Sequence, residues 1–270
     1  MLSSKRSGPW LFFALAYGLS WVFWIPAALS GLKFDEPPVP ILIALGGIGP
    51  MVAGIALTYV TQDREGWRDY WRRVADFKRI SPGWYAVILL TVPVLTALAV
   101  LLDILSGGRG AHLEARFQSG LVSILPFAIF TLFFGPLPEE LGWRGYALDR
   151  LQERYEALVS SLVLGTAWAL WHLPLFFIRG TYQNSLGLGS LEFWLYMAGI
   201  IPESILMTWI YNHNQRSTLS AVLFHFMINF IGELFALTER ADFYQVVVWA
   251  MAAIAVIAIW GPKTLTREGG

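Results

Sequence analysis

Two adjacent glutamates, Glu139 and Glu140, follow a break in a long apolar stretch and could carry out acid–base chemistry. An ionisable side chain inside the bilayer is costly, so each one is a candidate functional residue. On a helix, Glu140 and Arg144 are four residues apart, share one face and can pair. Glu139 points about 100° away around the helix axis and cannot share that arginine equally. We therefore expect a structural carboxylate at Glu140 and a carboxylate that is free to act as a base at Glu139. An ordinary helix start is the alternative, because a proline followed by two acids is typical of a first turn.

Three further polar side chains lie in later apolar stretches. His225 and Asn229 are four residues apart, so they project to the same side of a helix. His172 precedes Pro174, whose ring disturbs the helical hydrogen bonding, so the helix should bend there and can line a polar cavity. A histidine that merely bonds a neighbouring helix is the alternative interpretation for each position alone. The combination on three separate helices favours a functional site.

Other ionisable residues leave two different hypotheses open. Asp103 lies near a predicted helix end where water can solvate it, so we assign it no role. Glu203 and Glu233 lie in apolar stretches and, with the histidines, could form a proton relay. One hypothesis is therefore a proton-coupled transporter, although the chain lacks the repeat of broken helices that transporters carry. Another hypothesis is a catalytically silent membrane scaffold or immunity protein of the same fold.

The composition indicates what must position these side chains. Of 270 residues, 56% are hydrophobic and 14% are charged, whereas about a quarter are charged in a soluble domain. Disorder is excluded, and a net charge of zero without a long basic cluster argues against nucleic acid as a partner. The absence of cysteine excludes disulfides, Cys-ligated zinc and a thiol nucleophile.

We expect an all-α integral membrane protein, with about eight transmembrane helices in one bundle. Residues 1–270 form a single polytopic domain, and the active site is buried within the membrane. The predicted spans are 10–30, 39–61, 83–105, 119–137, 157–178, 190–212, 218–238 and 243–261.

The distribution of Lys and Arg predicts the orientation of this bundle. Fourteen of them, including Lys5, Arg6 and Arg267, fall on the side that holds both termini, and five fall on the other side. Both termini should therefore be cytoplasmic. The linker 63–80 has Trp67 and Trp71 at helical spacing among arginines, which predicts an interfacial amphipathic helix, with a solvated loop as the alternative.

The ordered motifs resemble a known family. Glu139-Glu140-x-x-x-Arg144, Trp168-x-x-x-His172 and His225-x-x-x-Asn229 occur in the order and spacing of the CAAX prenyl protease and bacteriocin-processing (Abi) family of intramembrane proteases. The segment Trp171-His172-Leu173-Pro174 is similar to the prokaryotic members, which implies a prokaryotic plasma membrane. The resemblance covers about 139–229. Trp168 stands where the family usually has Phe, and we expect this exchange to affect pocket shape rather than chemistry.

The resemblance also implies roles for the motif residues. Glu139 and His172 would activate a water molecule, His225 and Asn229 would stabilise the oxyanion, and Glu140 and Arg144 would organise the site. Peptide hydrolysis needs a base for water, donors for the oxyanion and a proton for the leaving amine, so the residue types agree. The main hypothesis is an intramembrane endopeptidase that acts on a hydrophobic or lipidated peptide in the bilayer, with prenylated CAAX-type proteins as one substrate class.

A metal-dependent site is the alternative to this chemistry. Glu139, His172 and His225 could supply three ligands to a divalent metal such as zinc and leave a fourth position for water. The sequence lacks His-Glu-x-x-His, Gly-x-Gly-Asp and Gly-x-Ser-Gly, so zincin-like, aspartyl and serine intramembrane proteases have no support. The resemblance favours the metal-free version, in which no cofactor is required.

Overall fold

The computed structural model describes residues 8–266 and is built almost entirely of helices. Lys5, Arg6 and Arg267, which contribute to the predicted orientation, lie outside the described residues. The α-helices are α1 Pro9–Leu29, α2 Val39–Gly47, α3 Gly49–Thr61, α4 Arg64–Ala75, α5 Pro82–Leu105, α6 Leu121–Phe134, α7 Pro136–Gly142, α8 Leu148–Gln152, α9 Ala157–Trp171, α10 Tyr182–Leu186, α11 Leu191–His213, α12 Thr218–Leu234 and α13 Glu239–Trp260. Shorter elements are the 3₁₀-helices η1 Phe77–Arg79, η2 Ala115–Phe117 and η4 Leu173–Phe177, the π-helix η3 Trp143–Ala147, and the strands β1 Ala111–Leu113 and β2 Phe235–Leu237.

Seven helical segments within 8–266 are long and apolar enough to cross a membrane: Pro9–Leu29, Val39–Thr61, Pro82–Leu105, Leu121–Gln152, Ala157–Phe177, Leu191–His213 and Glu239–Trp260. The predicted span 218–238 corresponds to α12, which has 17 residues and is followed by β2, so the count of eight is not confirmed. On α5, Leu90, Val94 and Leu98 form a row of exposed apolar side chains. Such a surface is suited to lipid rather than to water. The protein is an all-α integral membrane protein.

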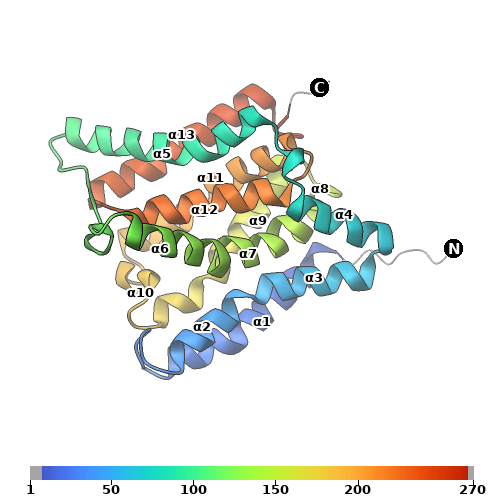
Figure 1. The fold of residues 1–270 in the computed structure, drawn as a ribbon, viewed down its shortest axis with the longest axis horizontal. Coiled ribbons are helices and arrows are strands. Elements are labelled where there is room, and N and C mark those ends of the chain that lie inside the picture. The colour runs from blue at the N-terminus through green and yellow to red at the C-terminus, as the bar shows by residue number, and fades with distance from the viewer. Residues whose placement is uncertain (1–7, 267–270) are drawn as a thin grey trace.

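Helices that are far apart in the sequence pack side by side (Figure 1). The α5 helix packs against α12 and α13, α11 packs against α9, α12 and α13, and α7 lies between α3 and α12. The three motifs are carried by α7 with η3, by α9, and by α12. These elements occupy the middle of the bundle, so the fold brings the motifs together from distant parts of the chain.

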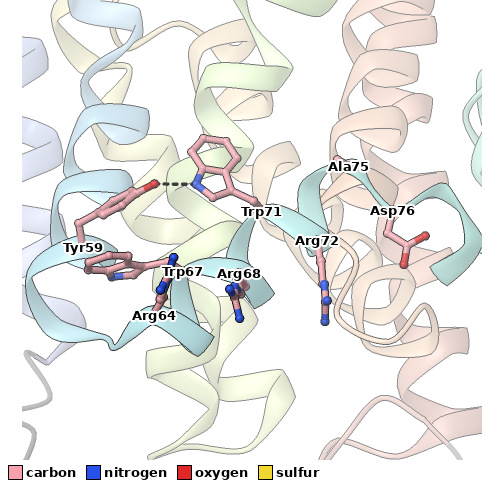
Figure 2. A pocket seen from close by; sticks show the side chains of 8 residues that line it. All are labelled: Tyr59, Arg64, Trp67, Arg68, Trp71, Arg72, Ala75 and Asp76. Atoms are coloured by element: carbon pink, nitrogen blue, oxygen red, sulfur yellow. Dashed lines mark hydrogen bonds between the residues drawn. The ribbon is translucent and has the colours of Figure 1, made fainter.

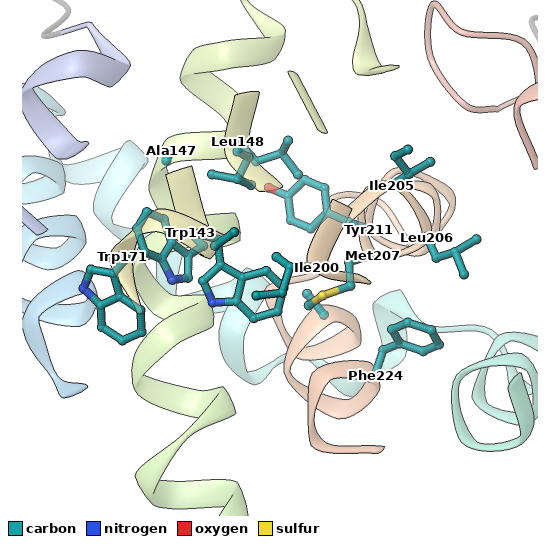
Figure 3. Packing of buried hydrophobic residues seen from close by; sticks show 14 of the residues in the cluster. Trp143, Ala147, Leu148, Trp171, Ile200, Ile205, Leu206, Met207, Tyr211 and Phe224 are labelled. Carbon is teal, nitrogen blue, oxygen red and sulfur yellow. The ribbon is translucent and has the colours of Figure 1, made fainter. Parts of the chain in front are cut away.

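Large aromatic side chains fill the core beside these elements. Trp143 and Trp171 are fully buried, with ring centroids 5.8 Å apart in an edge-on arrangement. Trp24 of α1 lies 4.5 Å from Trp171. Figure 3 shows the two tryptophans on one side of a buried cluster that also contains Met207 of α11 and Phe224 of α12. Burial of this apolar surface orders the helix ends that bear the polar residues.

Both predicted helix breaks are confirmed. Gly135 separates α6 from α7, and Pro136 begins α7 because a first-turn proline loses no helical hydrogen bond. Helix α9 ends at Trp171, and His172 precedes η4, which contains Pro174. Each break lies beside a predicted site residue.

The amphipathic linker forms α4, which is fastened to the segment after α7. Asp63 caps its start by accepting a hydrogen bond from the Gly66 amide at 2.9 Å. The hydroxyl of Tyr70 donates to the Leu141 carbonyl oxygen at 2.8 Å. Arg73 donates to the Gly145 carbonyl oxygen at 3.0 Å and to Asp149 Oδ2 at 2.6 Å. One face of α4 is therefore bonded to the chain around η3.

The opposite end of the bundle corrects two expectations. No strand was expected, but β1 and β2 form a short antiparallel pair. Asp103 is fully buried rather than solvated, because the loop after α5 folds over it. Its carboxylate accepts hydrogen bonds from the Gly110 amide at 2.8 Å, from Thr238 Oγ1 at 3.0 Å and from Arg240 Nε at 2.6 Å. These bonds tie the end of α5 to the start of α13 and give Asp103 a structural role.

Candidate active site

The acidic pair lies on α7, which is held tightly against α3. Glu139 and Glu140 are both buried. At Gly142 a Cβ atom would lie only 2.3 Å from the Pro50 carbonyl oxygen, so no larger residue fits without a shift of the backbone. The facing Gly54 allows the same approach, since its Cβ would lie 2.9 Å from the Gly142 Cα. This contact fixes the position of α7 relative to the rest of the bundle.

Glu140 is the centre of a buried ion pair. Its Oε1 accepts a hydrogen bond from Arg144 NH1 at 2.9 Å and another from His225 Nδ1 at 2.9 Å. The fully buried guanidinium of Arg144 also lies 5.0 Å from the ring centroid of Trp168 and 3.4 Å from Ser204 Oγ. The predicted pair of Glu140 with Arg144 is confirmed, and His225 extends it to α12. Within the described part of the chain, Glu140 Oε2 and Arg144 Nε have no hydrogen-bond partner.

Glu139 was expected to be free, but it is bonded to Trp168. The indole Nε1 donates to Glu139 Oε2 at 2.7 Å. Phenylalanine has no such donor, so the residue at position 168 changes the polar contacts of the site and not only its shape. The same indole ring lies 4.9 Å from the ring of His225 and 6.0 Å from that of His172. Trp168 therefore contacts all three motifs.

His172 has a defined orientation at the end of α9. Its Nδ1 lies 2.9 Å from the Trp168 carbonyl oxygen. A carbonyl oxygen can only accept, so Nδ1 carries the proton, and Nε2 of the neutral ring is left as an acceptor. The ring is packed edge-on against Trp171 at 4.8 Å and against Tyr196 of α11 at 5.8 Å. These contacts hold the ring in one position.

Asn229 lies near the start of α7, the helix that carries Glu139. Its Nδ2 is 3.2 Å from the position that a Cβ on Gly135 would occupy, so the amide lies beside the start of α7. Its side chain makes no hydrogen bond to residues within 8–266. Hydrogen bonds and ring contacts link the other predicted residues through Trp168, namely Glu139, Glu140, Arg144, His172 and His225.

Helix α11 contributes side chains that the motifs do not include. Ser204 is next to Arg144, and Tyr196 packs against His172. Glu203 interacts electrostatically with His225 and Arg144. The charge of Glu203 in an apolar stretch is a sequence signal, whereas Ser204 and Tyr196 carry none.

The proposed metal ligands do not form a ligand set. Across the described residues 8–266, no group of three or more His, Asp or Glu side chains is arranged to hold a metal ion. Glu139, His172 and His225 are therefore not grouped as a ligand set in this arrangement.

Comparison with known proteins supports the motif resemblance. The sequence model of the Type II CAAX prenyl endopeptidase Rce1-like family matches residues 121–231, a range that contains all the predicted site residues. The protein named CAAX prenyl protease 2 from Methanococcus maripaludis is 31% identical over 261 residues, which cover 95% of this chain and 96% of that protein. Similarity at this level along nearly the whole of both chains is not a local coincidence. The chain belongs to the Rce1-like family of CAAX prenyl endopeptidases.

Proposed function

We propose that this membrane protease hydrolyses a peptide bond in prenylated CAAX-type proteins, with Glu139 and His172 activating the attacking water. The observation that carries the proposal is the meeting of Glu139 and His172, from two membrane-spanning segments, with His225 of the adjoining α12 around Trp168. Membership in an endopeptidase family favours this function over a proton-coupled transporter and over a silent scaffold.

Water activation follows from the acceptors that remain. Glu139 accepts one hydrogen bond from Trp168, at Oε2, and its other oxygen is available to a water molecule. His172 presents Nε2 as an acceptor, because Nδ1–H is bonded to a backbone carbonyl. A water molecule that donates one proton to each of these groups turns its lone pairs away from both, toward a substrate carbonyl carbon. Transfer of a proton to Glu139 accompanies attack by the water oxygen.

The carbonyl electron pair then moves onto the substrate oxygen, which becomes an oxyanion. His225 donates its Nδ1–H to Glu140, so its Nε2 can donate to the oxyanion only when the ring is protonated. The carboxylate of Glu140 stabilises that positive ring. Asn229 supplies a neutral amide N–H as a second donor. When the C–N bond breaks, the carbonyl re-forms, the proton held by Glu139 passes to the leaving amine nitrogen, and a carboxylic acid and an amine are released.

The substrate class follows from where the site lies and from the relative. The motif residues lie within membrane-spanning segments and the adjoining α12, so a substrate must enter the bilayer to reach them. A prenyl group provides such an anchor on an otherwise soluble protein. The relative from Methanococcus maripaludis is named as a CAAX prenyl protease.

The experiment is a cleavage assay with purified protein in lipid nanodiscs. A farnesylated peptide that ends in a CAAX sequence is the substrate, and mass spectrometry detects loss of the last three residues. The same peptide without farnesyl and an unlipidated hydrophobic peptide are compared in parallel. We expect cleavage of the farnesylated peptide, and a fall of roughly 10²–10⁴-fold for Glu139→Gln.

Glutamine still accepts the bond from Trp168, so this variant should remain folded, and its thermal unfolding checks that point. Undiminished activity of Glu139→Gln would refute the mechanism. Preferred cleavage of the unlipidated peptide by the unaltered protein would refute the substrate class and leave the mechanism standing.

A further inference from the structure

An open groove of about 600 Å³ lies between α4 and the end of α3 (Figure 2). It is on the face of α4 opposite to the one that is bonded to the chain around η3. Its walls combine aromatic rings and guanidinium groups, from Tyr59, Trp67, Trp71, Arg64, Arg68 and Arg72. None of the residues that line this groove belongs to the candidate active site, so the groove requires its own explanation.

The three arginines of the groove form a row without an ion-pair partner among the described residues. Arg64, Arg68 and Arg72 are four residues apart along α4, so they share one face. Figure 2 shows their side chains extending from the same side of the helix. All three are exposed, and none makes an ion pair or a side-chain hydrogen bond with the described residues. By contrast, Arg73 and Arg79 in the same segment are both paired with Asp69.

The aromatic residues hold this row against the end of α3. Trp67 Nε1 donates to the Thr58 carbonyl oxygen at 3.2 Å, and Trp71 Nε1 donates to the Tyr59 hydroxyl at 3.0 Å. The rings of Tyr59 and Trp67 lie 4.7 Å apart. Tryptophan and tyrosine are enriched where a membrane meets water. The row of arginines is therefore fixed next to the end of a membrane-spanning segment.

The chemistry of the groove favours a phosphate with an apolar tail. The groove is lined by three guanidinium groups and by one carboxylate, that of Asp76. Its Oδ1 already accepts a hydrogen bond from the Lys78 amide at 3.1 Å. Guanidinium groups bind phosphate oxygens through paired N–H donors. On α3, Val60 is 81% exposed and Tyr59 is 43% exposed, so an acyl chain can lie along this helix while its headgroup reaches the arginines.

We propose that this groove binds the phosphate headgroup of an anionic phospholipid, in the leaflet that adjoins α4. Charge complementarity gives the selectivity over zwitterionic lipids, because a zwitterionic headgroup adds a cation beside the arginines. The exposed α3 face gives the selectivity over free phosphate. By the predicted orientation this is the cytoplasmic leaflet, where anionic lipids are concentrated.

The test measures lipid retention by the full-length protein in a non-ionic detergent. Delipidated protein is incubated with phosphatidylglycerol or with phosphatidylcholine, and native mass spectrometry counts the bound lipids. The variants are R64Q/R68Q/R72Q and a control that removes three exposed cations elsewhere, K33Q/R109Q/K263Q. We expect the groove variant to bind phosphatidylglycerol about a hundredfold more weakly at low salt, and the control to bind it as the unaltered protein does.

Further arms separate the alternative ligands and guard against misfolding. R68Q alone should weaken binding severalfold, and an unchanged thermal unfolding in phosphatidylcholine shows that each variant is folded. Equal retention of the two lipids, or equal loss in the control variant, would overturn the proposal. Displacement of the lipid by millimolar inorganic phosphate would assign the groove to free phosphate instead, and tighter binding of an acidic peptide would assign it to a protein partner.

Discussion

Two buried ionic clusters in this protein differ in how fully their acceptors are bonded. Around Asp149, Arg73 donates to Oδ2 at 2.6 Å, while the hydroxyl of Tyr211 and Nε of Arg216 each donate to Oδ1 at 2.9 Å. In the candidate active site, Glu140 uses only Oε1, and Oε2 has no partner within residues 8–266. Both clusters contain arginine and a carboxylate with little or no exposure.

The difference separates a structural cluster from a chemical one. A buried acceptor without a partner costs free energy, so its persistence needs a reason. At Asp149 both oxygens are bonded, and the cluster joins α4, α8, α11 and the loop before α12. At the site, acceptors are left on the glutamates and at the outer nitrogen of His172, where the proposed mechanism places water and substrate. Buried charge alone therefore does not identify a site, and the two clusters differ instead in whether a carboxylate oxygen remains unbonded.

The largest expected effect comes from the two site histidines. His172→Ala and His225→Ala should each lower kcat/KM by roughly 10²–10⁴-fold, since the proposed mechanism has each of them act on the reacting atoms. His213 is the matched control, because its Nδ1 is bonded to the Trp209 carbonyl oxygen at 3.0 Å, as that of His172 is to Trp168. Cleavage of a farnesylated peptide measures all three. A loss in His213→Ala as large as in the other two would show that the effect is structural.

The next effect should appear in stability and not in chemistry. Asp149→Asn keeps the shape of the side chain but leaves Arg73 without its buried partner. Arg73 keeps its partly exposed partner Asp69, so we expect a loss of about 3 kcal/mol of unfolding free energy, at the low end of the range for breaking a buried pair. Denaturant unfolding in detergent measures this change, and the activity per folded molecule should stay within a few-fold of the unaltered protein. If this variant kept its stability but lost its activity, the Asp149 cluster would have a functional role and would not be purely structural.

Asn229→Ala should lower kcat by roughly 10²–10³-fold if its amide contacts the oxyanion. Its side chain forms no hydrogen bond to the described residues, so the unfolding temperature should hardly change. Asn212→Ala is the counterpart, because Asn212 Nδ2 donates to Gln152 Oε1 and to the Thr264 carbonyl oxygen, both at 2.8 Å. It should lose stability and keep activity. The opposite pattern would remove Asn229 from the mechanism.

The smallest effect is expected for Trp168→Phe. The aromatic ring remains, but the hydrogen bond to Glu139 is lost, which should lower kcat about tenfold. Trp171→Phe removes a comparable bond, from Nε1 to Ser20 Oγ at 2.8 Å, outside the site. Comparison of the two variants in the cleavage assay isolates the contribution of the indole N–H. Equal activities would mean that Trp168 acts through its shape alone.

The sequence predicts local relations well because they follow from helix geometry. The pair of Glu140 with Arg144 depends only on a four-residue spacing, and the breaks at Gly135 and beside His172 depend on neighbouring prolines. The burial of Asp103 was missed, because its partner Arg240 comes from a distant helix end. Helix α12 was predicted too long, since an apolar sequence continues into β2.

Within the site, the contacts between helices were the part that could not be predicted. The bond from His225 to Glu140 joins residues 85 positions apart, and that from Trp168 to Glu139 joins residues 29 positions apart. Neither spacing has a period that sequence analysis can detect. The order of the motifs predicts which residues form the candidate site. The packing of the helices determines which atom of each side chain forms a hydrogen bond.

The indole of Trp168 has a mechanical consequence for the molecule. One rigid planar group touches Glu139, Arg144, His172 and His225. We therefore expect a displacement of α9 to move the neighbouring ionisable groups together and to leave their mutual spacing largely unchanged.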